Sequence, residues 1–285
     1  MVAFNRYIGS LSLGVFFLSL VAIFDRLLYP ISGYVNTFFG YSVVLILTTV
    51  FIFANKNIQE IRLKNKKKEL LLLALGQLGS AAFFLKAVQI IDFATTGLLL
   101  YSAPIWIALF YLITREEKIT AKIIIPLFLG IVGVILVLGP NEIINQNKNL
   151  GGILLALLSG ISYAVSFIFA RKIKDEYKTS SIVFWSHLIG AVVLLPFVFT
   201  NPLSIQKITV LYFLGIGFSW AIGYTFFYYS LKFIKAHLAS LIAITEPIFI
   251  ALWGYLFFSE PISISTLIGG ALLLANVYLI NKQIE

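Results

Sequence analysis

Long apolar runs cover most of the chain and leave only short polar connections between them. A helix that crosses a bilayer needs about 20 mostly apolar residues, and these runs have that length. They lack the strict alternation that is typical of barrel strands. The pattern predicts ten transmembrane helices, at about 7–24, 34–54, 70–91, 93–113, 121–139, 151–170, 180–199, 208–231, 234–258 and 262–281.

Composition supports an all-α integral membrane protein. Of the 285 residues, 60% are hydrophobic and 12% are charged, whereas a soluble domain carries about 25% charged residues. The chain has no cysteine, which excludes disulfides, thiolate metal sites and thiol nucleophiles. With two histidines and no catalytic cluster or phosphate-binding loop in the sequence, we expect no metal, no cofactor and no enzymatic activity.

The distribution of lysine and arginine predicts the topology. If the N-terminus is inside, 17 of the 21 basic residues fall on the inner side, and the four on the outer side are Arg26, Lys86, Lys148 and Lys207. This bias places both termini in the cytoplasm of a multi-pass plasma-membrane protein. The net charge of +9 therefore reflects topology and does not indicate nucleic acid. For the cluster at 64–68, a topology determinant is favoured over an anionic-lipid site.

The two halves of the chain contain an internal repeat. Residues 83–137 align with 226–280 at a constant offset of 143, and PIWIAL lies over PIFIAL. Pro104 falls on Pro247, and Glu117 falls on Glu260, each 13 residues after its proline. We therefore predict two units of five spans, residues 1–140 and 141–285, in a single membrane domain. Since five is odd, the second unit is inverted, an arrangement typical of secondary transporters.

The doubled motif resembles that of a known family. Residues 226–263 read FFYYSLKFIKAHLASLIAITEPIFIALWGYLFFSEPIS, and residues 83–120 are similar. Together they resemble the EamA family of the drug/metabolite transporter superfamily, over nearly the whole chain. The resemblance implies a transporter of small metabolites, often an exporter of amino acids or related compounds. That family often has two glycines seven residues apart in the last span of each unit. Here the positions are Pro126 and Gly133 in one unit and Gly269 and Asn276 in the other, so each unit keeps one glycine.

Two prolines and one glutamate are unusual within apolar runs. Pro104 and Pro247 each remove a helical hydrogen bond, so we expect kinks that leave the carbonyls of Leu100 and Ala243 without their usual donors. Such carbonyls need protein, water or ligand. The kinks could frame a cavity, or they are inherited packing kinks.

Glu246 is the main candidate for function. A centred acidic residue costs roughly 2.5–3.5 kcal/mol on insertion scales and usually marks a pathway. Its repeat counterpart is Ala103, so the charge is not needed by both units. We expect it to carry a proton or to bind a substrate amine; the alternative is a structural carboxyl bonded to a neighbouring helix.

Other polar and aromatic residues within the spans could complete a substrate site. The candidates are Gln77, Tyr101, Ser102, Tyr163, Trp220, Tyr224 and Tyr228. For each of them, helix packing or an interfacial position is the alternative. His187 is expected to be a satisfied interior histidine. Asp25 and Arg26 are expected to form an interfacial charge pair rather than an outer gate.

The predicted function is secondary transport. A small organic metabolite, such as an amino acid or a related compound, would be exported by alternating access, with protons as a candidate coupling ion. The chain would act in the lipid bilayer as a monomer or a homodimer. The alternatives are an uncoupled facilitator or channel for small solutes and, ranked lower, a membrane scaffold, receptor or enzyme.

Overall fold

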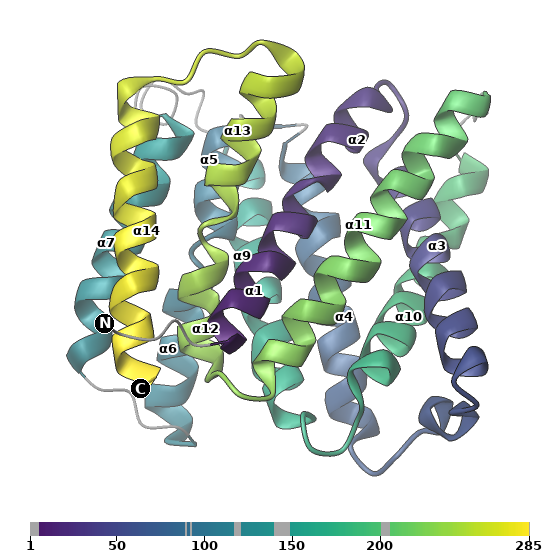
Figure 1. Cartoon of the computed structure of the whole chain (residues 1–285). Helices are drawn as coiled ribbons and strands as arrows, with labels where there is room; N and C mark the ends of the chain where they lie inside the picture. The colour runs from purple at the N-terminus through teal and green to yellow at the C-terminus, as the bar shows by residue number, and fades with distance from the viewer. Residues whose placement is uncertain are drawn as a thin grey trace.

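The computed structural model describes residues 6–88, 90–91, 93–116, 121–139, 149–200 and 206–284, and these are almost entirely helical (Figure 1). The helices of the first half are α1 (Arg6–Ser19), α2 (Val21–Leu27), α3 (Gly33–Ala54), η1 (Ile58–Ile61), α4 (Lys67–Ala87), α5 (Phe93–Leu100), α6 (Ala103–Thr114), η2 (Ala121–Ile123) and α7 (Ile124–Leu138). Those of the second half are α9 (Leu150–Lys172), α10 (Thr179–Thr200), α11 (Lys207–Leu231), α12 (Ala236–Ala243), α13 (Glu246–Phe258) and α14 (Ile264–Ile284).

The predicted class, an all-α integral membrane protein, is confirmed for these residues. Nine helical segments in the described part of the chain are long and apolar enough to cross a bilayer, and α7 is a shorter apolar helix of 15 residues. Their ends agree with the predicted spans to within a few residues. The predicted boundary at 140/141 and Glu117 lie outside the described residues.

The helix is interrupted just before each of the two prolines for which kinks were expected. Helix α5 ends at Leu100 before α6 begins at Ala103, and α12 ends at Ala243 before α13 begins at Glu246. Pro104 and Pro247 each occupy the first turn of the second helix. The missing proline N–H is not needed at that position. Each of these spans is therefore built from two half-helices.

Side chains bind the backbone carbonyls beside both interruptions. The Ser102 hydroxyl donates to the Leu99 carbonyl at 2.6 Å, and the Thr245 hydroxyl donates to the Ile242 carbonyl at 2.8 Å. Donors and acceptors in these two bonds are related by the same offset of 143. In the second half, the Asn276 amide also donates to the Leu241 carbonyl at 2.7 Å. The interruptions are thus stabilised within the protein, away from lipid.

The two remaining glycines of the last spans bring α7 and α14 together. A Cβ atom on Gly269 would lie 2.6 Å from the Gly133 carbonyl oxygen and 2.8 Å from the Val137 backbone nitrogen. Because neither glycine has a side chain, the backbones of α7 and α14 can approach each other closely at these two positions. Although each unit keeps only one glycine of the pair, close packing is preserved because the two glycines face one another.

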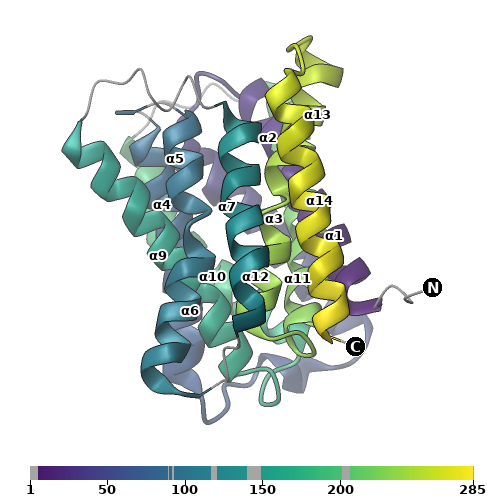
Figure 2. The same cartoon turned by 90° about the vertical axis from the view of Figure 1, so that its left-hand side faces the viewer.

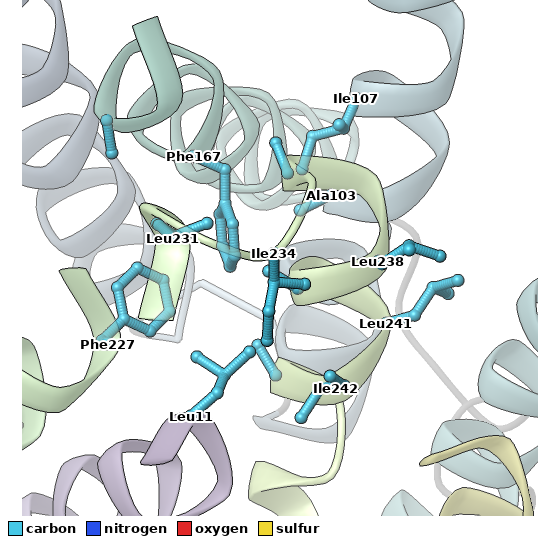
Figure 3. Close-up of a cluster of buried hydrophobic side chains, with 14 of the residues drawn as sticks. Leu11, Ala103, Ile107, Phe167, Phe227, Leu231, Ile234, Leu238, Leu241 and Ile242 are labelled. Atoms are coloured by element: carbon cyan, nitrogen blue, oxygen red, sulfur yellow. The ribbon is translucent and has the colours of Figure 1, made fainter. Parts of the chain in front are cut away.

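The largest apolar core surrounds α12, all eight residues of which are buried. This helix is contacted by α1, α6, α7, α9, α11 and α14. Figure 3 shows part of the cluster, in which Leu11, Ile107 and Ile242 come from three different helices. Phe167 and Phe227 meet edge to face at 4.8 Å. An apolar sequence on all sides suits a helix at the centre of a bundle.

The two halves of the chain interleave into one body (Figures 1 and 2). Helix α4 packs along α9, α1 along α11, α3 along α10, and α7 along α14. In each of these pairs, one helix comes from the first half of the sequence and one from the second. The bundle therefore depends on contacts between the halves.

The connectors at the lower end in Figure 1 are joined by hydrogen bonds. The backbone N–H of Lys64 donates to the Tyr177 hydroxyl at 2.9 Å, and that of Asn65 donates to a carboxylate oxygen of Glu176 at 3.2 Å. The Arg171 guanidinium donates to the carbonyls of Leu231 and Lys232, at 2.9 and 2.6 Å. The α3–α4, α9–α10 and α11–α12 connections are thereby held together.

The expected pair between Asp25 and Arg26 is wrong. Arg26 forms an ion pair with Glu260, next to α13, and the Asn36 amide donates to Asp25 at 2.8 Å. Neighbouring residues on a helix point in different directions, so each of these side chains finds its partner on another segment.

We predict that Gly269→Ala destabilises the protein, because its new methyl group would overlap the backbone of α7. Overpacking of this kind costs about 1–3 kcal/mol, measurable as a lower midpoint of thermal unfolding in detergent. Gly270→Ala is the matched control, since its Cβ would have Ile248 Cγ1 as its nearest neighbour, at 3.9 Å. Equal midpoints for the two variants would contradict the proposed close contact.

Candidate substrate-binding site

Glu246 lies where the two interrupted spans meet. It is the first residue of α13, and free backbone N–H groups at such a helix start favour a negative charge. Tyr101, in the other interruption, is within hydrogen-bonding reach of its carboxylate. Tyr163 of α9 and Tyr224 of α11 are close enough to interact with its charge. Of the sequence-predicted residues, Tyr101 therefore contacts Glu246, and Tyr163 and Tyr224 lie within electrostatic range of it.

A second polar cluster centres on the buried side chain of Gln77 in α4. The Tyr228 hydroxyl donates to Gln77 Oε1 at 2.5 Å, and Gln77 Nε2 donates to the Tyr41 hydroxyl at 3.4 Å. Gln77 Nε2 also lies 3.4 Å from His187 Nε2. The His187 Nδ1 atom lies 2.7 Å from the Val183 carbonyl.

These contacts define the state of the histidine. The Val183 carbonyl can only accept, so Nδ1 of His187 carries the proton and Nε2 accepts from Gln77. Both ring nitrogens have partners, which agrees with the expected satisfied interior histidine. Tyr41, by contrast, belongs to this cluster although sequence reasoning missed it. Within its span, nothing in the sequence distinguishes Tyr41 from a tyrosine that only packs between helices.

Aromatic contacts join the two clusters. Tyr224 stacks on Tyr228, with ring centroids 5.7 Å apart and an interplanar angle of 16°, and it meets His187 edge to face at 5.1 Å. Trp220 lies four residues before Tyr224 in α11, and its ring centroid is 5.1 Å from that of Tyr41. Polar and aromatic side chains from α3, α4, α9, α10, α11 and α13 thus form one continuous group.

Ser102 differs from the other predicted site residues. Its hydroxyl donates to Leu99 and accepts from the Trp106 indole nitrogen at 3.0 Å. Both bonds are local, and they make Ser102 part of the helix interruption beside Tyr101. The structure gives it a supporting position rather than a direct link to Glu246.

The arrangement offers one carboxylate, several hydroxyls and several aromatic faces. Such a set can bind an organic amine through charge and cation–π contact, or a proton on the carboxylate. In the described part of the chain, no group of three or more His, Cys, Asp or Glu residues could hold a metal ion.

Comparison with known proteins identifies the class. The sequence pattern of the EamA-like transporter family matches residues 6–139 and again residues 150–282. The chain belongs to this family and is a multi-pass membrane transporter. The resemblance seen in the sequence is confirmed.

Relatives and a solved structure agree with this class. An uncharacterized transporter of Archaeoglobus fulgidus is 30% identical, over 74% of this chain and 75% of the relative. The uncharacterized transporter YoaV of Bacillus subtilis is 25% identical, over 78% and 77%. The pseudopaline exporter CntI of Pseudomonas aeruginosa is 23% identical, over 71% and 72%. One crystal structure has the same fold, with a TM-score of 0.85 at 15% identity over 97% of this chain and 96% of the other.

We predict that Tyr228→Phe destabilises the protein, because it removes the donor to the buried Gln77 carbonyl oxygen. An unsatisfied buried acceptor costs about 1–3 kcal/mol, and thermal unfolding in detergent measures this loss. Tyr229→Phe is the matched control on the same helix, because this ring is 42% exposed. A Tyr228→Phe variant as stable as the control would show that the Gln77 contact contributes nothing.

Proposed function

We propose that the protein is a secondary transporter that moves a small organic metabolite with an amino group, such as an amino acid or a related compound, by alternating access. Its ten transmembrane helices would form two inverted five-helix units, residues 1–140 and 141–285. A monomer encloses the candidate site within one chain, and a homodimer is compatible with the same arrangement.

The packing pattern supports the inverted repeat. In an inverted repeat, each of the first five spans is equivalent to the span five places later. Helix α4 is then equivalent to α11, and α9 to α1, so the α4–α9 contact should recur as an α11–α1 contact, and both contacts are present. The α3–α10 and α7–α14 pairs are each converted into themselves. The two matches to the family pattern and the equivalent hydroxyl bonds of Ser102 and Thr245 agree with this exchange. Alternating access in such proteins works by rocking one repeat against the other.

The observation that carries the proposed mechanism is the position of Glu246 among Tyr101, Tyr163 and Tyr224. One carboxylate cannot hold a proton and pair with a cationic amine at the same time. Competition between the two would couple substrate movement to proton movement in the opposite direction. In this mechanism the equivalent prolines Pro104 and Pro247 would set the two interruptions at one depth, and residues beside both interruptions would line the substrate site.

Export across the plasma membrane is the proposed direction. The relative CntI bears the name of an exporter, and the resemblance to the family points the same way. Most basic residues lie in the connections at one end, which supports cytoplasmic termini.

We predict that Glu246→Gln abolishes the dependence of transport on a pH gradient. The amide neither takes up a proton nor carries a charge, so flux of an amine substrate should fall at least tenfold. The measurement is uptake into proteoliposomes, with and without a pH gradient, over a panel of amino acids and amines. Glu260→Gln is the control, because that carboxylate pairs with Arg26 on the surface.

Other outcomes separate the alternatives. An uncoupled facilitator or channel would give a flux that does not depend on the pH gradient and is unchanged in Glu246→Gln. It would also show counterflow without any gradient. Absence of flux for the whole panel in a folded protein favours a scaffold or receptor.

We predict that single cysteines will report cytoplasmic termini, because the natural chain contains no cysteine to interfere. Lys68→Cys should resist a membrane-impermeant maleimide in intact cells, whereas Ser263→Cys, between α13 and α14, should react. The reverse labelling pattern would invert the proposed topology. Permeabilised cells, in which both positions should react, provide the control.

A further inference from the structure

A pocket lies between the α3–α4 connector and the start of α10. In Figure 1 these segments are at the lower end of the bundle. Its volume is about 380 Å³, within the range of about 300–1,000 Å³ typical of ligand pockets. The lining residues are Lys56, Asn57, Gln59, Glu60, Lys64, Lys178 and Ser181. Nothing in the proposed transport mechanism uses this pocket.

The pocket carries excess positive charge. Its one carboxylate, Glu60, accepts from the Lys178 ammonium at 2.7 Å and from the Ser180 hydroxyl. Burial alone would raise the pKa of Glu60, but these hydrogen bonds outweigh it and lower the pKa below its usual value. Glu60 is therefore ionised at neutral pH and its charge is balanced by Lys178. The charges of Lys56 and Lys64 have no such balance within the pocket.

The walls of the pocket are held in place. The Ser181 hydroxyl donates to the Glu60 carbonyl at 2.6 Å, and the Trp185 indole donates to the Ile61 carbonyl at 3.0 Å. The Lys64 ammonium donates to the Glu176 carbonyl at 2.5 Å, which is a neutral acceptor. The connector is therefore held against α10 at Glu60 and Ile61, and Lys64 is held against the α9–α10 connection.

An exposed apolar face of α3 ends shortly before the pocket residues in the sequence. Ile46, Val50 and Phe53 are spaced four and three residues apart, so they share one face of α3. They are 61%, 61% and 52% exposed. In a helix that crosses the bilayer, such a face contacts acyl chains. The face ends three residues before Lys56, which places the pocket at the depth of the lipid headgroups.

We propose that this pocket binds the phosphate-bearing headgroup of an anionic phospholipid. The ammonium groups of Lys56 and Lys64 pair with the phosphate, the amides of Asn57 and Gln59 bind polar headgroup atoms, and an acyl chain lies along Ile46, Val50 and Phe53. This is a defined site, which differs from a general attraction between anionic lipid and the basic residues at 64–68.

The test compares lipid binding to detergent-purified full-length protein by native mass spectrometry, with dioleoylphosphatidylglycerol and dioleoylphosphatidylcholine as probes. Lys56→Asn with Lys64→Gln should weaken binding of phosphatidylglycerol at least fivefold and leave phosphatidylcholine unchanged. Lys67→Gln with Lys68→Gln is the matched control. It removes the same charge from the same region outside the pocket, and it should retain wild-type binding.

A loss of phosphatidylglycerol binding in the Lys56 variants is not expected to come from misfolding. Lys56 has a φ of 55°, a left-handed conformation that asparagine adopts more readily than lysine. Lys56→Asn alone therefore keeps the fold and should still weaken phosphatidylglycerol binding. The unfolding midpoint of each variant checks this.

Two results would overturn the proposal. If the Lys67/Lys68 control loses as much affinity as the pocket variant, the attraction is diffuse. If inorganic phosphate raises the unfolding midpoint as much as phosphatidylglycerol does, and only when the pocket lysines are present, the site takes a free anion instead of a lipid.

Discussion

Backbone groups inside a bilayer must find hydrogen-bond partners within the protein. At the two interruptions, residues 101–102 and 244–245, nearby backbone groups lose their helical partners and need others. Here the partners come from hydroxyl side chains, Ser102 and Thr245, and from the Asn276 amide. The two hydroxyl bonds are local to each interruption, whereas the Asn276 bond comes from α14 and depends on how that helix packs against α12. The burial of all eight residues of α12 keeps the backbone before the second interruption away from lipid.

The two halves share the residues that shape the interrupted spans, and they differ in the residues that could bind a substrate. Pro104 and Pro247 are equivalent, as are the hydroxyls of Ser102 and Thr245. Glu246 corresponds to Ala103, and Asn276 corresponds to Gly133, so the second half alone carries the carboxylate and the extra amide. A site at the meeting of two similar halves thereby acquires one charged side. In the proposed transport mechanism, that asymmetry would give the substrate a defined orientation.

The sequence predicted the fold well, because apolar runs of membrane-spanning length have few alternatives. It also predicted the neighbourhood of Glu246, Tyr101, Tyr163 and Tyr224, since polar groups in lipid gather in the interior. It failed where contacts depend on how helices are rotated against one another. Tyr41 was missed because one tyrosine in an apolar span looks like any packing residue. Asp25 and Arg26 were paired wrongly because adjacency along the chain is not adjacency on a helix surface.

The lower connectors add a further consequence. The bonds from Lys64 and Asn65 to Tyr177 and Glu176 join the first half of the chain to the second, and Arg171 ties the end of α9 to the end of α11. Separation at this end would exchange these protein–protein hydrogen bonds for bonds to water, so each of them favours the joined form by only a modest amount. Several together therefore determine how firmly the lower connectors are held to one another.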